Sequence, residues 1–131
     1  MRAGLLPGTR ARVDAVVTPD MVATLGGSAV HPLLATAKMI EWMEWAGRRL
    51  ILPYLEPDED AVGYRVDVTH RRPTAVGQPF WATAQFVARE GTRILADVAA
   101  FNAEGLIGEG RFVQVLVSRT RLGPAFGPPR A

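Results

Sequence analysis

The chain has 131 residues, of which 48% are hydrophobic and 21% are charged. This composition is typical of a globular protein with one hydrophobic core, and it excludes a chain that is disordered throughout. The net charge of +2 is too small for the electrostatic surface of a typical nucleic-acid-binding protein. Because the chain has no cysteine, disulfide bonds, thiolate metal sites and cysteine nucleophiles are excluded.

The remaining composition also argues against a metal site and a membrane location. The two histidines, His31 and His70, are too few for a histidine-rich metal site. The N-terminus lacks the apolar run of a signal peptide, and no stretch approaches the roughly 18 uncharged apolar residues that a membrane span needs. We therefore expect a cytoplasmic protein that uses no cofactor or metal ion and binds neither a membrane nor nucleic acid.

The first half of the chain predicts one strand, one loop and one long helix. Residues 10–18 are expected to form a strand, and residues 21–34 a long loop, since this segment contains Gly26-Gly27 and His31-Pro32. A loop of this length in a small domain often covers a functional site. Residues 36–52 are expected to form a helix ended by Pro53, because apolar residues recur at helical spacing on one face: Met39, Trp42, Met43, Ala46 and Leu50.

The second half predicts four strands: residues 62–71, 80–89, 93–101 and 106–118. Short turns join the last three, which indicates an antiparallel meander. The fold class is therefore α+β, with one long helix against a five-stranded antiparallel sheet in a single domain of residues 1–121. Residues 122–131 are rich in glycine and proline and are expected to form a disordered tail. Since one helix covers only one face of five strands, we expect a second copy to complete the structure.

Three residues are candidates for chemistry, and each has a structural alternative. Glu44 lies at the edge of the apolar helix face, where a carboxylate can act as base or nucleophile; alternatively it pairs with Arg48, four residues on. His70 ends a strand in which Tyr64, Val66, Val68 and His70 are expected to share the face toward the helix. It is either a general acid or base or a core histidine. Thr36 is either catalytic or the helix N-cap.

Two further groups of residues that contain carboxylates are not expected to be functional sites. The segment Glu56 to Asp60 lacks the glycine and spacing of a calcium loop, so a solvated turn is expected. Asp67 and His70 are three apart on a strand and face opposite sides. They are therefore a poor catalytic pair.

Several short sequence motifs contain or adjoin the three candidate residues and point to one protein family. The predicted helix contains Met43-Glu44-Trp45-Ala46 and is followed by Pro53-Tyr54-Leu55-Glu56-Pro57, and Val68-Thr69-His70 comes later. From about Val17 to Val117 the sequence resembles the fluoroacetyl-CoA thioesterase family of hot-dog proteins. The resemblance implies a hot-dog fold, with a long central helix wrapped by the sheet. It also implies catalytic roles for Thr36, Glu44 and His70 and a functional role for Gly63. Hot-dog proteins usually pair their sheets in a dimer, with the active sites at the interface.

The chain departs from the founding member of that family in two places. The founding member shields its pocket with phenylalanines before the helix, where this chain has Val30, His31 and Pro32 and no aromatic residue from Met1 to Glu41. Gln114 stands in place of an arginine in the last strand. We therefore expect hydrolysis of a short or medium acyl-CoA without a preference for fluorine, with Val30 and His31 contacting the substrate.

The expected assembly is a homodimer, with a tetramer as the larger alternative. Arg71 and Arg72 directly follow His70 and either bind the phosphates of CoA or are ordinary surface charges. Two other functions stay open. One is an acyl-CoA-binding protein without hydrolysis, and the other, ranked lower, is an acyl-CoA hydratase, because hydratases on this fold generally use an Asp–His pair.

Overall fold

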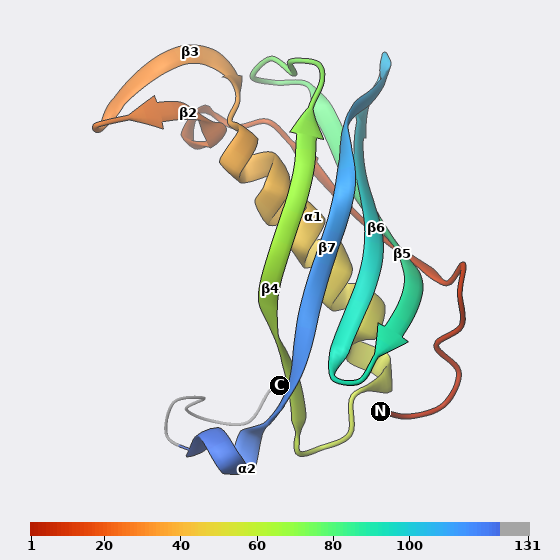
Figure 1. The fold of residues 1–131 in the computed structure, drawn as a ribbon. Coiled ribbons are helices and arrows are strands. Elements are labelled where there is room, and N and C mark those ends of the chain that lie inside the picture. The colour runs from red at the N-terminus through yellow and green to blue at the C-terminus, as the bar shows by residue number, and fades with distance from the viewer. Residues whose placement is uncertain (124–131) are drawn as a thin grey trace.

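The amphipathic segment predicted to be helical forms helix α1, Thr36–Ile51, which continues as a short 3-10 turn over Leu52–Tyr54. In the computed structural model, which describes residues 1–123, α1 lies across one face of a twisted antiparallel sheet (Figure 1). The sheet consists of β1 (Arg10–Val16), β4 (Glu59–His70), β5 (Pro79–Glu90), β6 (Arg93–Asn102) and β7 (Gly105–Ser118). A two-stranded hairpin, β2 (Val22–Leu25) and β3 (Ser28–Leu34), and a short C-terminal helix α2 (Arg119–Leu122) complete the described elements. The predicted α+β class and five-stranded sheet are confirmed.

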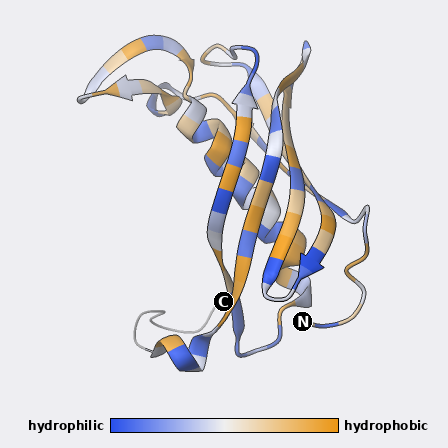
Figure 2. Cartoon of the chain, in the orientation of Figure 1, coloured by the Kyte–Doolittle hydropathy of each residue, from blue (hydrophilic) through white to orange (hydrophobic). Residues whose placement is uncertain are grey.

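The strand order in the five-stranded sheet is β1-β5-β6-β7-β4, so β1 and β4 are its two edges. Burial alternates from residue to residue along most of β5 and β6, which gives the sheet one face for the core and one for solvent. Along β4 and β7, hydrophilic residues interrupt the hydrophobic ones (Figure 2). The hydrophobic core lies between α1 and the face of the sheet that is turned toward the helix. Its largest fully buried members include Met39 and Met43 from the helix and Phe80, Ile94 and Ile107 from the strands.

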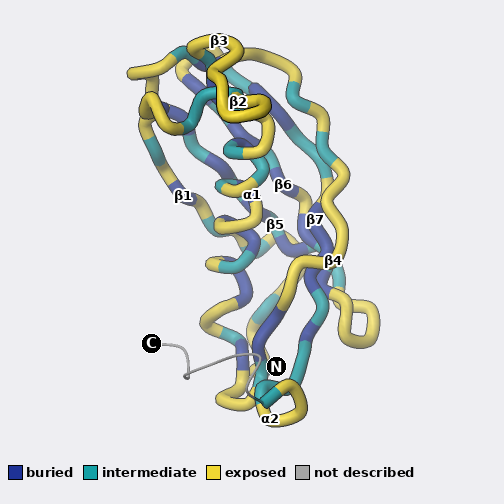
Figure 3. The backbone as a smooth tube through the Cα atoms, turned by 90° about the vertical axis from the view of Figure 1, so that its left-hand side faces the viewer, coloured by how far each residue is buried: buried dark blue, intermediate teal, exposed yellow. Residues whose placement is uncertain are grey.

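The predicted loop over residues 21–34 is wrong, because most of this segment is the β2–β3 hairpin. Gly26 and Gly27 have φ values of 58° and 84°, and they form the two-residue turn between the paired strands. A two-residue hairpin turn requires positive φ at both central residues. The Gly26-Gly27 pair, which suggested a loop, therefore indicates a hairpin turn. The hairpin projects from the N-terminal end of α1, and much of it is exposed (Figure 3).

The predicted alternation along β4 is wrong at one residue. A β-bulge between Gly63 and Arg65 inserts an extra residue, so Tyr64 lies on the solvent face of the sheet instead of the helix face. There the Tyr64 hydroxyl accepts a hydrogen bond from Arg93 Nη2 at 3.0 Å, and the guanidinium lies 4.7 Å from the ring centroid. Val68 still packs against the core, as predicted.

The C-terminal end of the described chain is anchored to the start of β4. The Arg119 backbone N–H donates to the Asp58 carbonyl at 2.7 Å, and Asp58 also accepts from the Ser118 and Thr120 side chains. The predicted tail of residues 122–131 begins at Leu122, the last residue of α2, and residues 124–131 lie outside the described part. Within residues 1–123, no helix combines the length and hydrophobicity needed to cross a membrane.

Candidate active site

Thr36 and His70 meet where the start of α1 faces the end of β4. Thr36 Oγ1 lies 2.8 Å from His70 Nδ1, within hydrogen-bond distance. The alternative that Thr36 caps the helix is wrong, because Ala35 is the N-cap residue and no side chain caps this end. The threonine hydroxyl is therefore engaged by the histidine.

His70 is placed to accept a proton at neutral pH. Burial lowers the pKa of His70 from its ordinary value of 6.5, and an interaction with the Arg72 backbone opposes this effect only in part. With Nδ1 held by Thr36, the second ring nitrogen Nε2 is buried and has no hydrogen-bond partner among residues 1–123. A neutral imidazole with one unused nitrogen can bind a water or substrate atom and exchange a proton with it.

A hollow of about 260 Å³ surrounds this pair beneath the hairpin. His31 from β3 and Arg71 and Arg72 after β4 line it together with Thr36 and His70. The two arginines also have protein partners: Arg71 Nη2 lies 2.8 Å from Glu109 Oε1, and Arg72 Nη1 donates to the Glu104 carbonyl at 3.3 Å. Four of the predicted site residues therefore gather around Thr36.

Val30 lies outside this group. It is 54% exposed on β3 and does not line the hollow. Its side chain is therefore accessible on the hairpin above the site rather than part of the wall around the Thr36–His70 pair.

Glu44 lies in a second hollow, of about 340 Å³, which it shares with Trp45, Gly63 and Phe112. A methyl group built on the Gly63 Cα would stand 3.7 Å from Glu44 Oε2, an ordinary van der Waals distance, so Gly63 lies directly beside the carboxylate. The alternative that Glu44 pairs with Arg48 is wrong, since Arg48 Nη1 donates instead to Asp60 Oδ1 at 2.9 Å. Glu44 is exposed and makes no hydrogen bond or ion pair with any residue in the described range 1–123.

The two hollows are far apart within one chain. Thr36 and Glu44 are eight residues apart on α1, which corresponds to about 12 Å along the helix axis. Gly63 and His70 are seven residues apart on β4, which corresponds to about 23 Å along the strand. One copy of the chain therefore does not bring all three predicted catalytic residues to one point.

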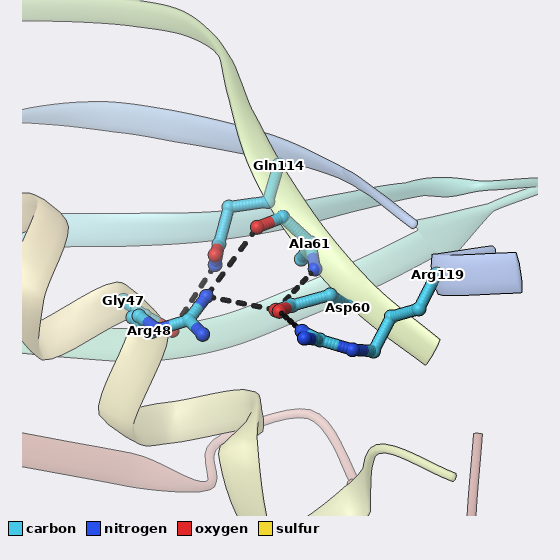
Figure 4. Close-up of polar contacts among 6 residues, drawn as sticks. All are labelled: Gly47, Arg48, Asp60, Ala61, Gln114 and Arg119. Carbon is cyan, nitrogen blue, oxygen red and sulfur yellow. Dashed lines mark hydrogen bonds and ion pairs between the residues drawn. The ribbon is translucent and has the colours of Figure 1, made fainter. Parts of the chain in front are cut away.

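Two buried polar residues that bind groups of α1 have roles that the sequence did not predict. Asp60 is 4% exposed, so the last residue of the acidic segment is buried rather than part of a solvated turn. Gln114 is 3% exposed, and its Nε2 donates to the Gly47 carbonyl at 3.1 Å, which ties β7 to α1 (Figure 4). The sequence motif indicates only that Gln114 replaces an arginine of the family, not that its side chain is buried. In residues 1–123 no group of three or more histidine, aspartate or glutamate side chains is arranged to hold a metal ion.

Comparisons with known proteins identify relatives of this chain. The sequence model of the fluoroacetyl-CoA-specific thioesterase family matches residues 17–120. A fluoroacetyl-CoA thioesterase from Streptantibioticus cattleyicolor is 32% identical over 123 residues, which cover 89% of this chain and 88% of that protein. A thioesterase superfamily member from Thermus thermophilus is 36% identical, with a TM-score of 0.89 over 95% of this chain and 92% of that one. A hot-dog-like protein from Thermanaerovibrio acidaminovorans shares the fold, with 24% identity and a TM-score of 0.80 over 93% of each chain.

The fold is that of the hot-dog thioesterase superfamily. Within that class, the chain belongs to the fluoroacetyl-CoA-specific thioesterase family. The resemblance inferred from the sequence motifs is therefore confirmed, and the protein is a thioester hydrolase.

Proposed function

We propose that the protein hydrolyses a short or medium acyl-CoA thioester to the free acid and CoA, with Thr36, Glu44 and His70 as its catalytic residues. The observation that carries this proposal is the Thr36–His70 hydrogen bond, which holds the imidazole ring by Nδ1, while the buried Nε2 has no hydrogen-bond partner among residues 1–123. A solved variant of the fluoroacetyl-CoA thioesterase holds acetyl-CoA. This supports an acyl-CoA as the substrate class here.

The proposed chemistry divides among three groups. Glu44 either attacks the thioester carbonyl or removes a proton from the attacking water. His70 orients water through Nε2 and transfers protons, while Thr36 fixes the orientation of the imidazole ring. The first backbone N–H groups of α1 lack intrahelical partners and are available to stabilise the oxyanion that forms on the carbonyl oxygen.

We propose that a homodimer brings Glu44 to the Thr36–His70 pair. Strand β4 is an edge of the sheet with three exposed apolar side chains, Val62, Tyr64 and Val66, which is an unusual surface to leave in water. Antiparallel pairing of two β4 strands through such an edge would satisfy its free backbone groups and join the two sheets.

The proposed pairing has the register that would bring the two hollows together. Gly63 lies three to four residues before the Val66–Asp67 segment of β4, and His70 lies three to four residues after it. A two-fold axis through this segment therefore sets Gly63 of one copy opposite His70 of the partner subunit. Because Glu44 lies against Gly63, its carboxylate would face the partner subunit's His70, and each dimer would contain two composite sites.

The positive charge around the Thr36 hollow suits an anionic substrate. Arg71 and Arg72 lie at its wall, and we assign them to the phosphates of CoA. Both are partly exposed, so their charge reaches a ligand at the mouth of the site. Replacement of either by glutamine is expected to raise KM for the acyl-CoA more than it lowers kcat.

A panel of acyl-CoAs, assayed for free thiol, tests the proposed function. The protein contains no cysteine, so every thiol detected comes from product. Thiol release from short or medium acyl-CoAs is expected. Binding without thiol release would favour a non-hydrolytic acyl-CoA-binding protein. Hydration of an enoyl-CoA would favour a hydratase, although Asp67 is exposed and lies 3.8 Å from Arg65 Nη2 in an ion pair.

A further inference from the structure

Asp60 lies at the centre of a polar cluster that joins α1, β4 and α2 (Figure 4). Its Oδ1 accepts hydrogen bonds from Arg48 Nη1 at 2.9 Å and from the Ala61 backbone N–H at 2.8 Å. Its Oδ2 accepts one from Arg119 Nη1 at 2.7 Å. The carboxylate is almost fully buried, and a buried charge is stable only when it is paired and hydrogen-bonded in this way.

Arg48 has a second potential partner, which it does not use. Glu44 precedes it by four residues on α1, the spacing and order at which an acidic and a basic side chain pair best on a helix. Arg48 binds Asp60 instead because attraction between charges is stronger near the protein interior than in water. The competition between these two carboxylates therefore decides where the Arg48 guanidinium lies.

Arg48 is the one cation that lines the hollow of Glu44 in the described part of the chain. The other charged group from α1 is Glu41, which is paired with Lys38 at 3.2 Å. From β4 and β7, the residues at this hollow are Ala61, Gly63, Phe112 and Gln114, none of which carries a charge. If Arg48 were released, Glu44 would be its nearest exposed carboxylate on the helix.

We propose that Asp60 is a positioning residue for Glu44, because it holds Arg48 away from the Glu44 carboxylate and so keeps that carboxylate free to react. Arg119 fixes Asp60 in turn, which connects the C-terminal helix α2 to the site. An ion pair with arginine stabilises the charged form of a carboxylate and makes it a weaker base and nucleophile. This inference rests on the proposed catalytic role of Glu44.

The test is a cycle of variants at positions 60 and 48, with kcat and KM measured on the best acyl-CoA. An Asp60→Asn substitution removes the charge that holds Arg48 while keeping the shape of the side chain. Its kcat is expected to fall about 10-fold or more with little change in KM, as for loss of an interaction made in the transition state. Adding Arg48→Met is expected to restore most of kcat, whereas Arg48→Met alone stays within about twofold of wild type.

A purely structural role for Asp60 gives a different pattern. In that case the double variant is as impaired as Asp60→Asn or more so, and this result overturns the proposal. An unchanged kcat in folded Asp60→Asn protein also overturns it, as does a loss of about 10-fold or more in Arg48→Met alone.

Two further variants keep the test decisive. If Asp60→Asn does not fold, Asp60→Asn/Arg119→Met also removes the second arginine that binds Asp60 and still releases Arg48, so the same loss of kcat and the same rescue are expected. Glu44→Gln is measured in parallel. Normal turnover in Glu44→Gln refutes the proposed function of Glu44, whereas an inactive Glu44→Gln beside a fully active Asp60→Asn refutes only this inference.

Discussion

Thr36 Oγ1 and His70 Nδ1 lie 2.8 Å apart, so the first residue of α1 is hydrogen-bonded to the last residue of β4 although 34 positions separate them. The contact exists because β4 runs along the helix and ends beside its N-terminal turn. It places an imidazole near the unpaired N–H groups of that turn. The same arrangement leaves Glu44 two turns further along the helix.

A Glu44→Gln substitution tests the catalytic role of the carboxylate. Glutamine keeps the shape of the side chain but removes its negative charge, so kcat is expected to fall by about 10²–10⁴-fold, the usual contribution of a general base. Glu41→Gln on the same helix is the matched control and is expected to keep normal turnover. Circular dichroism establishes that both variants are folded. Near-normal turnover in Glu44→Gln would remove this residue from the mechanism.

Complementation between two inactive variants tests the composite site. Glu44→Gln and His70→Ala chains, co-expressed with different affinity tags and purified as the mixed dimer, would form one site with both wild-type residues. That dimer is expected to recover about half of the wild-type turnover, since one of the two sites in a two-fold dimer is intact. If all catalytic residues act within one chain, the mixed dimer stays inactive. Sedimentation at micromolar concentration provides the independent measurement of the dimer itself.

The lowered pKa of His70 predicts how stability depends on pH. Because burial holds this pKa below 6.5 in the folded state, the unfolded chain binds the proton more readily. The stability that comes from neutral His70 is therefore fully present above about pH 6.5 and is lost as pH falls toward the folded-state pKa. The melting temperature of wild type is expected to fall more steeply between about pH 7 and 5 than that of His70→Gln. Parallel slopes for the two proteins would contradict this assignment.

The aliphatic side chain of Val30 leads us to predict how well the enzyme distinguishes a fluorinated acyl-CoA from its unfluorinated counterpart. Because the chain has no aromatic side chain at or before this position, fluoroacetyl-CoA and acetyl-CoA are expected to be hydrolysed with kcat/KM values within about 10-fold of each other. A Val30→Phe substitution adds an aromatic ring to the hairpin above the site and is expected to raise the preference for the fluorinated substrate. A strong fluorine preference in the wild-type enzyme would refute the prediction.

Gly47 is predicted to be intolerant of even a methyl group. A Cβ at this position would stand 2.6 Å from Phe112 Cδ2 and 2.8 Å from Cε2, inside a well-packed core. Overpacking typically costs about 1–3 kcal/mol, whereas alanine gains up to about 1 kcal/mol of helix propensity over glycine, so Gly47→Ala is expected to lower the free energy of unfolding. In urea titrations, Phe112→Leu should reduce the cost of Gly47→Ala. Additive effects of the two substitutions would show that the contact is relieved elsewhere.

Much of the fold was predictable from local patterns. The apolar residues from Met39 to Leu50 recur at helical spacing, and Pro53 follows the helix, so its position needed no long-range information. The β5–β6–β7 meander was likewise marked by short turns at Gly91 and Gly105. Spacing and motif resemblance point to Thr36, Glu44 and His70 as candidate site residues without any tertiary information.

Other features depended on residues distant in the chain. The bulge that turns Tyr64 to solvent is defined by pairing with β7, and the two-residue turn at Gly26-Gly27 forms only because its flanking segments pair. Hairpin pairing and strand register are tertiary properties, since the same glycine and proline residues are equally compatible with an open loop.

The partners of charged residues were the least predictable from sequence. By itself the sequence determined which residue types are available and which lie on one face of the helix, because side-chain periodicity is a local property of the backbone. Only the tertiary structure decided that Asp60 is buried between Arg48 and Arg119, that Glu44 is thereby left unpaired, and that Thr36 binds His70. The strength of an ion pair or hydrogen bond depends on burial and on the distance to groups from other segments, and packing sets both of these.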